Sequence, residues 1–295
     1  MFQGLTLLPH VNIENRAQLC LISILDKLNS VEILNLLSYI YTMGTKTKIQ
    51  WTDATWNPVT GCTKISSGCK NCYAERFAER FRGVKGHPFE SGFDLTLRHA
   101  RIKQPLSWRN PRMVFVNSMS DLFHEDVPES YIAKVFNTME QAYWHTFQIL
   151  TKRSDIMCDF VTERYKNSNV PYNIWFGVSI EHRALIDRAK HLRKTPAVIR
   201  FLSMEPLIGS IGHLNLSDIH WVIVGGESGC GSREMKREWV TDIRDQCENA
   251  GVAFFFKQWG GARPKHNGRI LDGVEWSGFP TAPSKQPSLF GATVP

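Results

Sequence analysis

Three cysteines, Cys62, Cys69 and Cys72, lie close together in the stretch "GCTKISSGCKNCYAERFAERF", with the spacing C-x6-C-x2-C. Thiolates are ligands for zinc and for iron–sulfur clusters, and a pair separated by two residues is common in both. Cys72 also stands at the start of a predicted amphipathic helix, where the helix dipole favours a thiolate. The cluster therefore predicts a metal centre that has one protein ligand fewer than a complete tetrahedral set.

Three interpretations of these cysteines compete. A structural zinc ion needs a fourth protein ligand, for which His87 and His99 are the nearest candidates. Incidental buried cysteines are a second possibility, although three within one short loop are not expected by chance. The third is a [4Fe–4S] cluster with three cysteine ligands. It is favoured because an iron without a protein ligand has a purpose when a cofactor or substrate binds it.

Polar residues that could serve such a centre follow a series of predicted strands. The strands are short apolar runs at 113–118, 147–151, 174–180, 199–204, 221–226 and 252–257, and predicted helices lie between them. Alternating strands and helices indicate a parallel sheet, whose carboxyl ends form one face that holds the site. The candidate site residues there are Ser118, Ser120, Asp121, Ser179, Glu181, Gly225, Gly226 and Glu227, with Lys152 and Glu205 as the candidates for catalysis.

The glycine-rich stretch "GGESGCGS" (225–232) matches neither the dinucleotide fingerprint nor the P-loop pattern, so a nucleoside-triphosphate site is rejected. Its glycines still allow a ligand to approach the backbone closely. Glu227, within this stretch, is then placed to accept hydrogen bonds from ribose hydroxyls or an amino group.

The composition is that of a globular protein: 295 residues, 42% hydrophobic and 21% charged, with a net charge of +7. Residues 1–42 contribute −1 (two basic against three acidic residues), so the remaining chain carries +8. A basic surface favours polyanions such as nucleic acid, although enzymes with small anionic substrates are equally basic.

The odd number of cysteines, seven in all, argues against a disulfide framework and favours a reducing cytoplasm. The apolar run from Leu19 to Ile40 is interrupted by charges and makes a poor membrane span. We expect residues 1–42 to form an N-terminal helical extension without catalytic residues, either a packing helix or a segment upstream of a natural start at Met43. Residues 43–280 are expected to form the α/β domain, and 281–295 a disordered tail.

The motifs taken in order identify a family. "KIQWTDATWNPVTGCTKISSGCKNCYAERFAER", "VFVNSMSDLFHEDVP", "FQILTKR", "WFGVSIE", "RFLSMEPLIG", "WVIVGGESG" and "FFFKQWGG" resemble the phage Gp37/Gp68 family (DUF5131) over roughly residues 46–280. That family is related to the radical S-adenosylmethionine (SAM) superfamily. Typical members of the superfamily space their cysteines C-x3-C-x2-C, so the first gap here is three residues longer.

The resemblance implies a partial (β/α)6 TIM-like barrel with parallel strands and outer helices, in which the cysteine loop follows the first strand, here within "TWNPVT". It implies that Cys62, Cys69 and Cys72 hold a [4Fe–4S] cluster whose fourth iron binds SAM, and that an electron donor reduces the cluster. Ser118, Ser120 and Asp121 would contact the methionine amino group. Ser179 and Glu181 would contact the ribose or carboxylate.

The function that the residues and the resemblance predict together is a radical SAM-like iron–sulfur enzyme that modifies or repairs nucleic acid or a nucleotide. A partner protein from a neighbouring gene is part of this expectation. The first alternative is a non-catalytic nucleic-acid-binding protein stabilised by zinc or a cluster, in which tryptophans of "IQWTDATWNP" and "KQWGG" stack on bases. The second is a metal-free hydrolase that uses Asp121, His124 and Glu205, although no nucleophile elbow is present.

Overall fold

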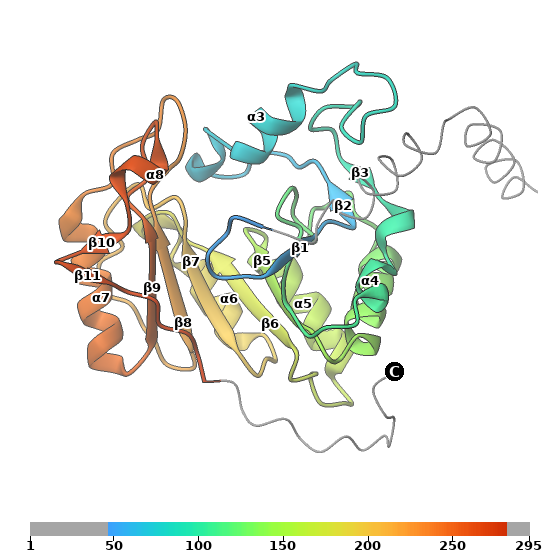
Figure 1. Ribbon diagram of the computed structural model, residues 1–295. Helices are drawn as coiled ribbons and strands as arrows, with labels where there is room; N and C mark the ends of the chain where they lie inside the picture. Colours follow the sequence, from blue (N-terminus) through green and yellow to red (C-terminus); the bar gives the residue numbers. More distant parts are fainter. Residues whose placement is uncertain (1–46, 282–295) are drawn as a thin grey trace, which may run out of the picture. The chain divides into compact units, whose positions relative to one another are not determined.

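A seven-stranded parallel sheet organises the protein (Figure 1). The computed structural model describes residues 47–281, so the predicted N-terminal extension and C-terminal tail lie outside the described residues. The strand order β1-β4-β5-β6-β7-β8-β9 follows the chain, and each neighbouring pair is parallel. Within the described residues β1 and β9 are the two edges. The predicted partial α/β barrel is therefore confirmed, with seven strands where a (β/α)6 barrel has six.

The strands coincide with the apolar runs of the sequence. They are β1 (Ala54–Trp56), β4 (Met113–Val116), β5 (Thr146–Thr151), β6 (Ile174–Ser179), β7 (Arg200–Met204), β8 (Trp221–Gly225) and β9 (Ala253–Gln258). The central strands β6 and β8 are buried along their whole length, as expected for strands covered on both faces. The stretch "TWNPVT" divides between β1 and a short strand β2 (Val59–Thr60), which pairs antiparallel with β3 (Thr96–Leu97).

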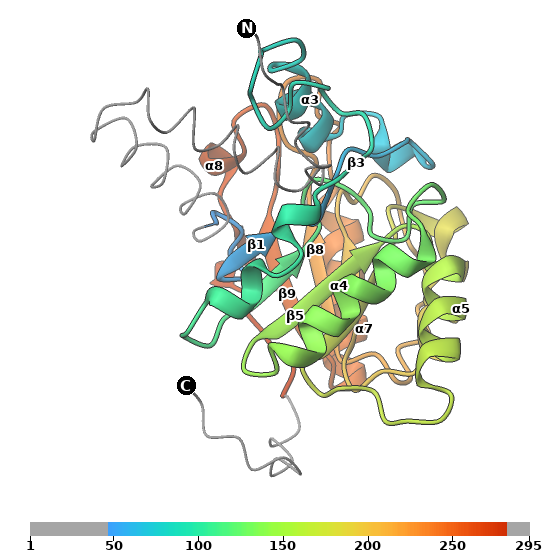
Figure 2. The ribbon, with the colours of Figure 1, turned by 90° about the vertical axis from the view of Figure 1, so that its right-hand side faces the viewer.

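The connecting helices cover the outer face of the sheet. They are α4 (Glu129–Gln141), α5 (Ser154–Tyr165), α6 (Asp187–Lys194) and α7 (Arg237–Ala250). Pro128 is the N-cap of α4, and Gly251 ends α7 in the left-handed conformation that glycine adopts without strain. Figure 2 shows α4 beside α5, and Arg164 of α5 binds Glu140 of α4 across this contact.

Two apolar cores lie on opposite faces of the sheet, because strand side chains alternate between faces. In β4, Val114 and Val116 belong to the large core under the helices, whereas Phe115 points to the inside of the barrel. The inner core is aromatic and includes Trp51, which contacts Phe115 at 4.7 Å and Trp221 at 6.2 Å between ring centroids. Trp51 therefore closes one end of the barrel interior.

The smaller elements lie at the ends of the sheet. Helix α3 (Tyr73–Glu79) lies above the carboxyl ends of the strands in Figure 1, apart from the outer helices. A short helix α8 (Pro264–Asn267) and a hairpin of β10 (Ile270–Leu271) and β11 (Val274–Glu275) follow β9. Among the described residues, no helix combines the length and apolar character that crossing a membrane requires.

Candidate functional site

The three cysteines lie on a loop that leaves β2 and ends at α3. Gly61 opens this loop with a φ of 82°, and a Cβ there would lie 2.2 Å from the carbonyl oxygen of Asp94, so only glycine fits. A turn of 3-10 helix, Ser67–Cys69, follows, and Cys72 is the N-cap of α3. All three thiols are free and partly buried.

A cavity of about 380 Å³ lies between this loop and the carboxyl ends of the strands. All three cysteines line it, so the prediction that the loop faces the polar end of the barrel agrees with the structure. Its apolar floor is formed by Ile49, Trp51, Phe115 and Leu150. The polar wall comes from six strand ends and includes Asn117, Ser118, Ser120, Asp121, Lys152, Arg153, Ser179, Ser203, Glu205, Ser228, Lys257 and Gln258.

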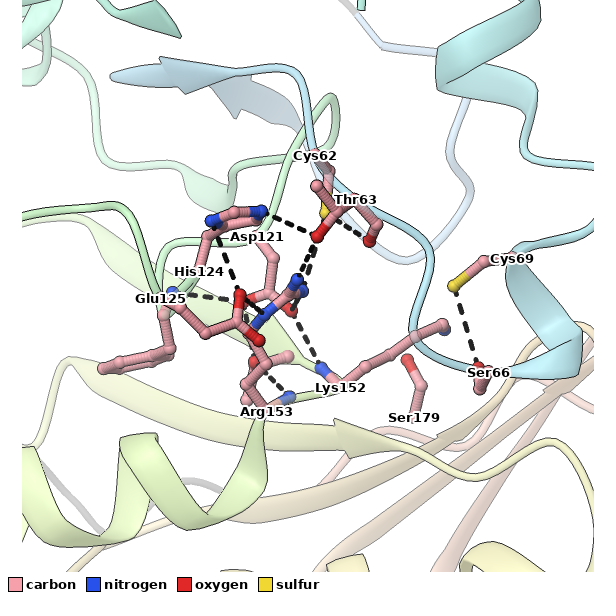
Figure 3. Close-up of polar contacts among 12 residues, drawn as sticks. Cys62, Thr63, Ser66, Cys69, Asp121, His124, Glu125, Lys152, Arg153 and Ser179 are labelled. Atoms are coloured by element: carbon pink, nitrogen blue, oxygen red, sulfur yellow. Dashed lines mark hydrogen bonds and ion pairs between the residues drawn. The ribbon is translucent and has the colours of Figure 1, made fainter. Parts of the chain in front are cut away.

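Arg153, which follows β5, holds the first cysteine (Figure 3). Its guanidinium donates to Thr63 Oγ1 at 2.9 Å and to Cys62 Sγ at 3.6 Å. The same group pairs with Glu125 at 2.8 Å and with buried Asp121 at 3.3 Å. Because a guanidinium offers five donors in a fixed plane, one side chain fixes both the loop and the strand ends.

Glu181, which follows β6, holds the loop next to the second cysteine. Its carboxylate is fully buried and accepts a hydrogen bond from Ser66 Oγ at 2.8 Å, while Ser66 Oγ lies 3.7 Å from Cys69 Sγ. Lys152 at 3.0 Å and Arg188 at 2.9 Å balance its charge. Burial alone would raise the pKa of Glu181, but the two cations and the Ser66 hydrogen bond outweigh burial and hold the pKa below its usual value.

Glu227, which follows β8, holds the loop next to the third cysteine. The buried carboxylate accepts hydrogen bonds from Asn71 Nδ2 at 2.8 Å and from the backbone and side chain of Arg233. Arg233 also donates to the carbonyl oxygen of Ser67 at 3.0 Å. Burial opposes ionisation here too, yet the hydrogen bonds from Arg233 and Asn71 lower the pKa of Glu227 to about 2.

Two of the three thiols, Cys62 and Cys72, lie in surroundings that favour the protonated form. Burial raises the pKa of Cys62 to about 11, and it also raises the pKa of Cys72. The N–H groups of Ala74 and Glu75 act in the opposite direction on Cys72, which is the expected helix-terminus effect, but burial outweighs it. A bound metal centre would supply the positive charge that these thiolates need.

The residues after β4 mostly support the backbone. Ser118 Oγ donates to Asn57, Ser120 Oγ donates to the carbonyl oxygen of Val59 at 2.7 Å, and Asp121 accepts from Thr151, Lys152, Phe123 and Arg153. All three line the cavity, as does Ser179. Their contacts with a cofactor stay predictions.

Asn117 also follows β4, although it is not among the predicted site residues, and its side chain differs from those of its neighbours. It lines the cavity, is 3% exposed and has the positive φ of 60° that asparagine tolerates. Its Nδ2 is buried without a hydrogen-bond partner among the described residues. The cavity wall at this strand end therefore contains one amide donor that the described residues leave unsatisfied.

The predicted catalytic residues lie on opposite parts of the wall. Lys152 lines the cavity while its ammonium binds Glu181. Glu205 lines the cavity, pairs with Lys257 at 2.7 Å and accepts from Ser203 at 3.3 Å. Lys257 is the penultimate residue of β9 and, like Asn117 and Arg153, lies outside the predicted set of site residues. Its position at the end of an apolar run was the available signal.

Gly225 and Gly226 do not line the cavity, and neither do Glu181 and Glu227. A Cβ on Gly225 would lie 2.8 Å from Glu205 Oε1, and one on Gly226 would lie 2.0 Å from the carbonyl oxygen of Trp259. These glycines therefore make room for neighbouring protein groups. Their predicted role in cofactor binding stays a prediction.

The geometry does not support a zinc site in which a histidine is the fourth ligand. Neither His87 nor His99 lines the cavity: His87 stacks on Phe81 at 3.8 Å, and His99 packs edge-on against Tyr131. Over residues 47–281, no three His, Cys, Asp or Glu side chains are arranged to hold a single metal ion. Three soft donors on one cavity, without a fourth cysteine or histidine in its lining, fit a cluster with an open position.

The tryptophans predicted to stack on bases and the residues predicted for a hydrolase already have other contacts in the protein. Trp51 and Trp56 are buried in the cores, and Trp259 packs on Phe256, so base stacking by the first two is excluded. His124 engages Thr63 through Nε2 and accepts from the backbone of Asp126 through Nδ1. In the part of the chain that the structure describes, no hydrogen bond joins His124 to the side chains of Asp121 or Glu205.

The fold and the site together define an open parallel α/β barrel that carries a three-cysteine loop over the cavity at its carboxyl end. Residues 46–280 match the model of the family described as Protein of unknown function (DUF5131). The chain belongs to this family.

A search of curated proteins found no match. Among solved structures, the chain is similar to a double mutant of spore photoproduct lyase with bound AdoMet and dinucleoside spore photoproduct, with 12% identity and a TM-score of 0.39. It is also similar to the lyase complexed with dinucleoside spore photoproduct, with 11% identity and a TM-score of 0.40. Both matches cover 70% of this chain and 64% of the lyase chain.

Proposed function

We propose that this DUF5131 protein is an iron–sulfur enzyme of the radical SAM type, related to the phage Gp37/Gp68 proteins, that acts on nucleic acid or a nucleotide. One observation carries the proposal: three free thiols from one loop line a cavity at the carboxyl ends of parallel strands, and no other cysteine or histidine lines it. Cys62, Cys69 and Cys72 would hold a [4Fe–4S] cluster and leave one iron for SAM.

A bound [4Fe–4S] cluster with SAM on its open iron would supply one-electron chemistry for removing a hydrogen atom from the substrate. The chain contributes position and shielding. Arg153, Glu181 and Glu227 fix the loop, and the apolar floor keeps water from one side of the cavity.

The substrate-facing wall would be that of Glu205, Lys257 and Ser203, which lie on β7 and β9 or directly after them. Lys152 lies nearer the loop because it pairs with Glu181. We therefore assign Glu205 to contact with the substrate. We assign Lys152, which also lines the cavity, to the positioning of the cysteine loop.

The test is reconstitution of the full chain under anaerobic conditions. The expected result is about four iron and four sulfide per chain and visible cluster absorbance, both lost in Cys69→Ala and kept in Cys158→Ala, whose cysteine lies on α5 outside the cavity. After reduction with SAM, 5′-deoxyadenosine should be released. One zinc and no iron in anaerobically purified protein would instead establish the zinc alternative.

A further inference from the structure

The connection between β3 and β4 carries an uncompensated positive charge. From Leu95 to Arg112 the sequence contains no aspartate or glutamate, and the flanking acidic residues are Asp94 and Asp121. We call this stretch, residues 98–112, the basic segment. Its cations are Arg98, Arg101, Lys103, Arg109 and Arg112.

None of these five side chains forms an ion pair with a carboxylate within the described residues. The two flanking carboxylates are already engaged: Asp94 pairs with Arg82 at 2.8 Å, and Asp121 pairs with Arg153. Some arginines elsewhere bind a carboxylate, among them Arg188, Arg233 and Arg244. The basic segment is therefore a concentration of charge that the protein does not neutralise itself.

The basic segment begins at the cysteine loop and runs along the edge strand of the sheet. Arg98 Nε donates to Thr60 Oγ1 at 2.8 Å, two residues before Cys62. Further along, the carbonyl oxygen of Arg101 accepts from Trp56 of β1 at 2.7 Å. Figure 2 shows the segment, in teal to green, passing alongside β1. Lys103 and Arg109 are exposed, and the other three cations are half-buried.

The charges repel one another. Burial lowers the pKa of Arg101, and the neighbouring charge of Arg98 lowers it further. Arg112 lies over the ring of Trp108 at 5.2 Å, and its Nη1 is buried without a partner among the described residues. An anion along this segment would relieve the repulsion among the cations.

We propose that the basic segment binds the phosphodiester backbone of a nucleic acid and leads the strand toward the cavity mouth. Five cations spread along fifteen residues suit a repeating anion, and none of them lines the cavity, where a small anionic substrate would bind. An anionic membrane is disfavoured, because interfacial binding also needs exposed apolar side chains. The large exposed hydrophobic residues lie outside this segment.

Binding of this kind reads the backbone and not the bases, since the aromatic residue of the segment, Trp108, is buried. It predicts affinity that falls steeply with salt and depends little on sequence. The inference rests on the part of the proposed function that names nucleic acid as the substrate. It does not depend on the cluster.

The experiment measures the binding of the full chain to a labelled DNA strand, its duplex and the matching RNA strand by fluorescence anisotropy over a salt series. The test variant is Lys103→Gln/Arg109→Gln, which changes two exposed side chains. The control is Lys166→Gln/Lys194→Gln, which removes the same charge from two exposed positions at the ends of α5 and α6.

For the test variant, the slope of log K against log salt should become less steep by about 1.4 to 1.8, which is two phosphate contacts, while the control keeps the wild-type slope. An equal change in both variants would mean that only net charge matters and would overturn the proposal. So would the absence of salt-dependent binding, or tighter binding to anionic lipid vesicles than to any of the three nucleic acids. Iron content should not change in either variant, so failure here leaves the cluster proposal standing.

Discussion

Gly68 and Glu181 are in such close contact that a Cβ on Gly68 would lie 2.5 Å from the Glu181 carboxylate. The two residues are 113 positions apart in the chain. Gly68 stands directly before Cys69, so the absence of a side chain there lets the cysteine loop rest on a buried charge. The contact fixes the position of the loop before Cys69 relative to the end of β6.

Gly68→Ala should displace the loop, because Glu181 is held by Lys152 and Arg188 and cannot move away. We expect the variant to lose about 1–3 kcal/mol of stability, as over-packing usually costs, and to retain less iron after reconstitution. Urea unfolding and iron analysis measure the two effects. Lys70→Ala, at the exposed position after Cys69, is the control, and equal iron in Gly68→Ala and wild type would contradict the prediction.

Arg153→Lys should weaken the hold on Cys62. A lysine cannot bind Thr63, Asp121 and Glu125 at once, whereas the guanidinium contacts all three. The expected loss is about 2–3 kcal/mol with faster release of iron to a chelator. Arg193→Lys, whose arginine donates to one carbonyl oxygen at 3.1 Å, should behave as wild type. Chelator-release rates that match for the two variants would show that Arg153 has no such role.

The lowered pKa of Glu227 should make the stability of the protein depend on pH. Its pKa in the folded protein is about 2, below the ordinary value of 4.5, so its stabilising contribution is complete above pH 4.5 and is lost as pH falls toward 2. The full contribution is on the order of 3 kcal/mol. Glu227→Gln cannot titrate, so its unfolding free energy should lie below that of wild type at pH 7 and converge with it on acidification. Urea titrations at several pH values test this, and parallel pH curves would count against it.

Glu205→Gln separates catalysis from cluster binding. Glu205 touches Lys257 and Ser203 and not the cysteine loop, so iron content should equal that of wild type. If Glu205 transfers a proton, turnover of the substrate should fall about 100-fold or more. Metal analysis and product formation are measured on the same preparation. A parallel loss of iron would reassign Glu205 to support of the loop.

Periodicity and local composition predicted most of the fold. The apolar runs coincide with β4 to β9, and Pro128 and Gly251 mark helix ends where expected. Such features depend on neighbouring residues, which a sequence displays directly. The division of "TWNPVT" into two strands was not predicted, because β2 pairs with β3, which lies beyond the cysteine loop.

The site was predicted in part. The thiols and the strand-end residues Ser118, Ser120 and Ser179 line the cavity as expected from the topology. The engagement of Glu181 and Glu227 with the cysteine loop could not be read from the sequence, since each contact joins residues more than a hundred positions apart. Asn117 was missed for a similar reason, because its unsatisfied amide appears only when the surrounding donors and acceptors are placed.

The attachment of the cysteine loop to several strands couples the position of the cysteines to the shape of the sheet. It is fastened after β5 by Arg153, after β6 by Glu181 and after β8 by Glu227, and these strands span much of an open sheet whose edges β1 and β9 do not pair within the described residues. An open sheet can flex in a way that a closed barrel cannot. If the sheet changes its curvature, the three strand ends that hold the loop move relative to one another. The distances between the three sulfur atoms then change with the curvature of the sheet.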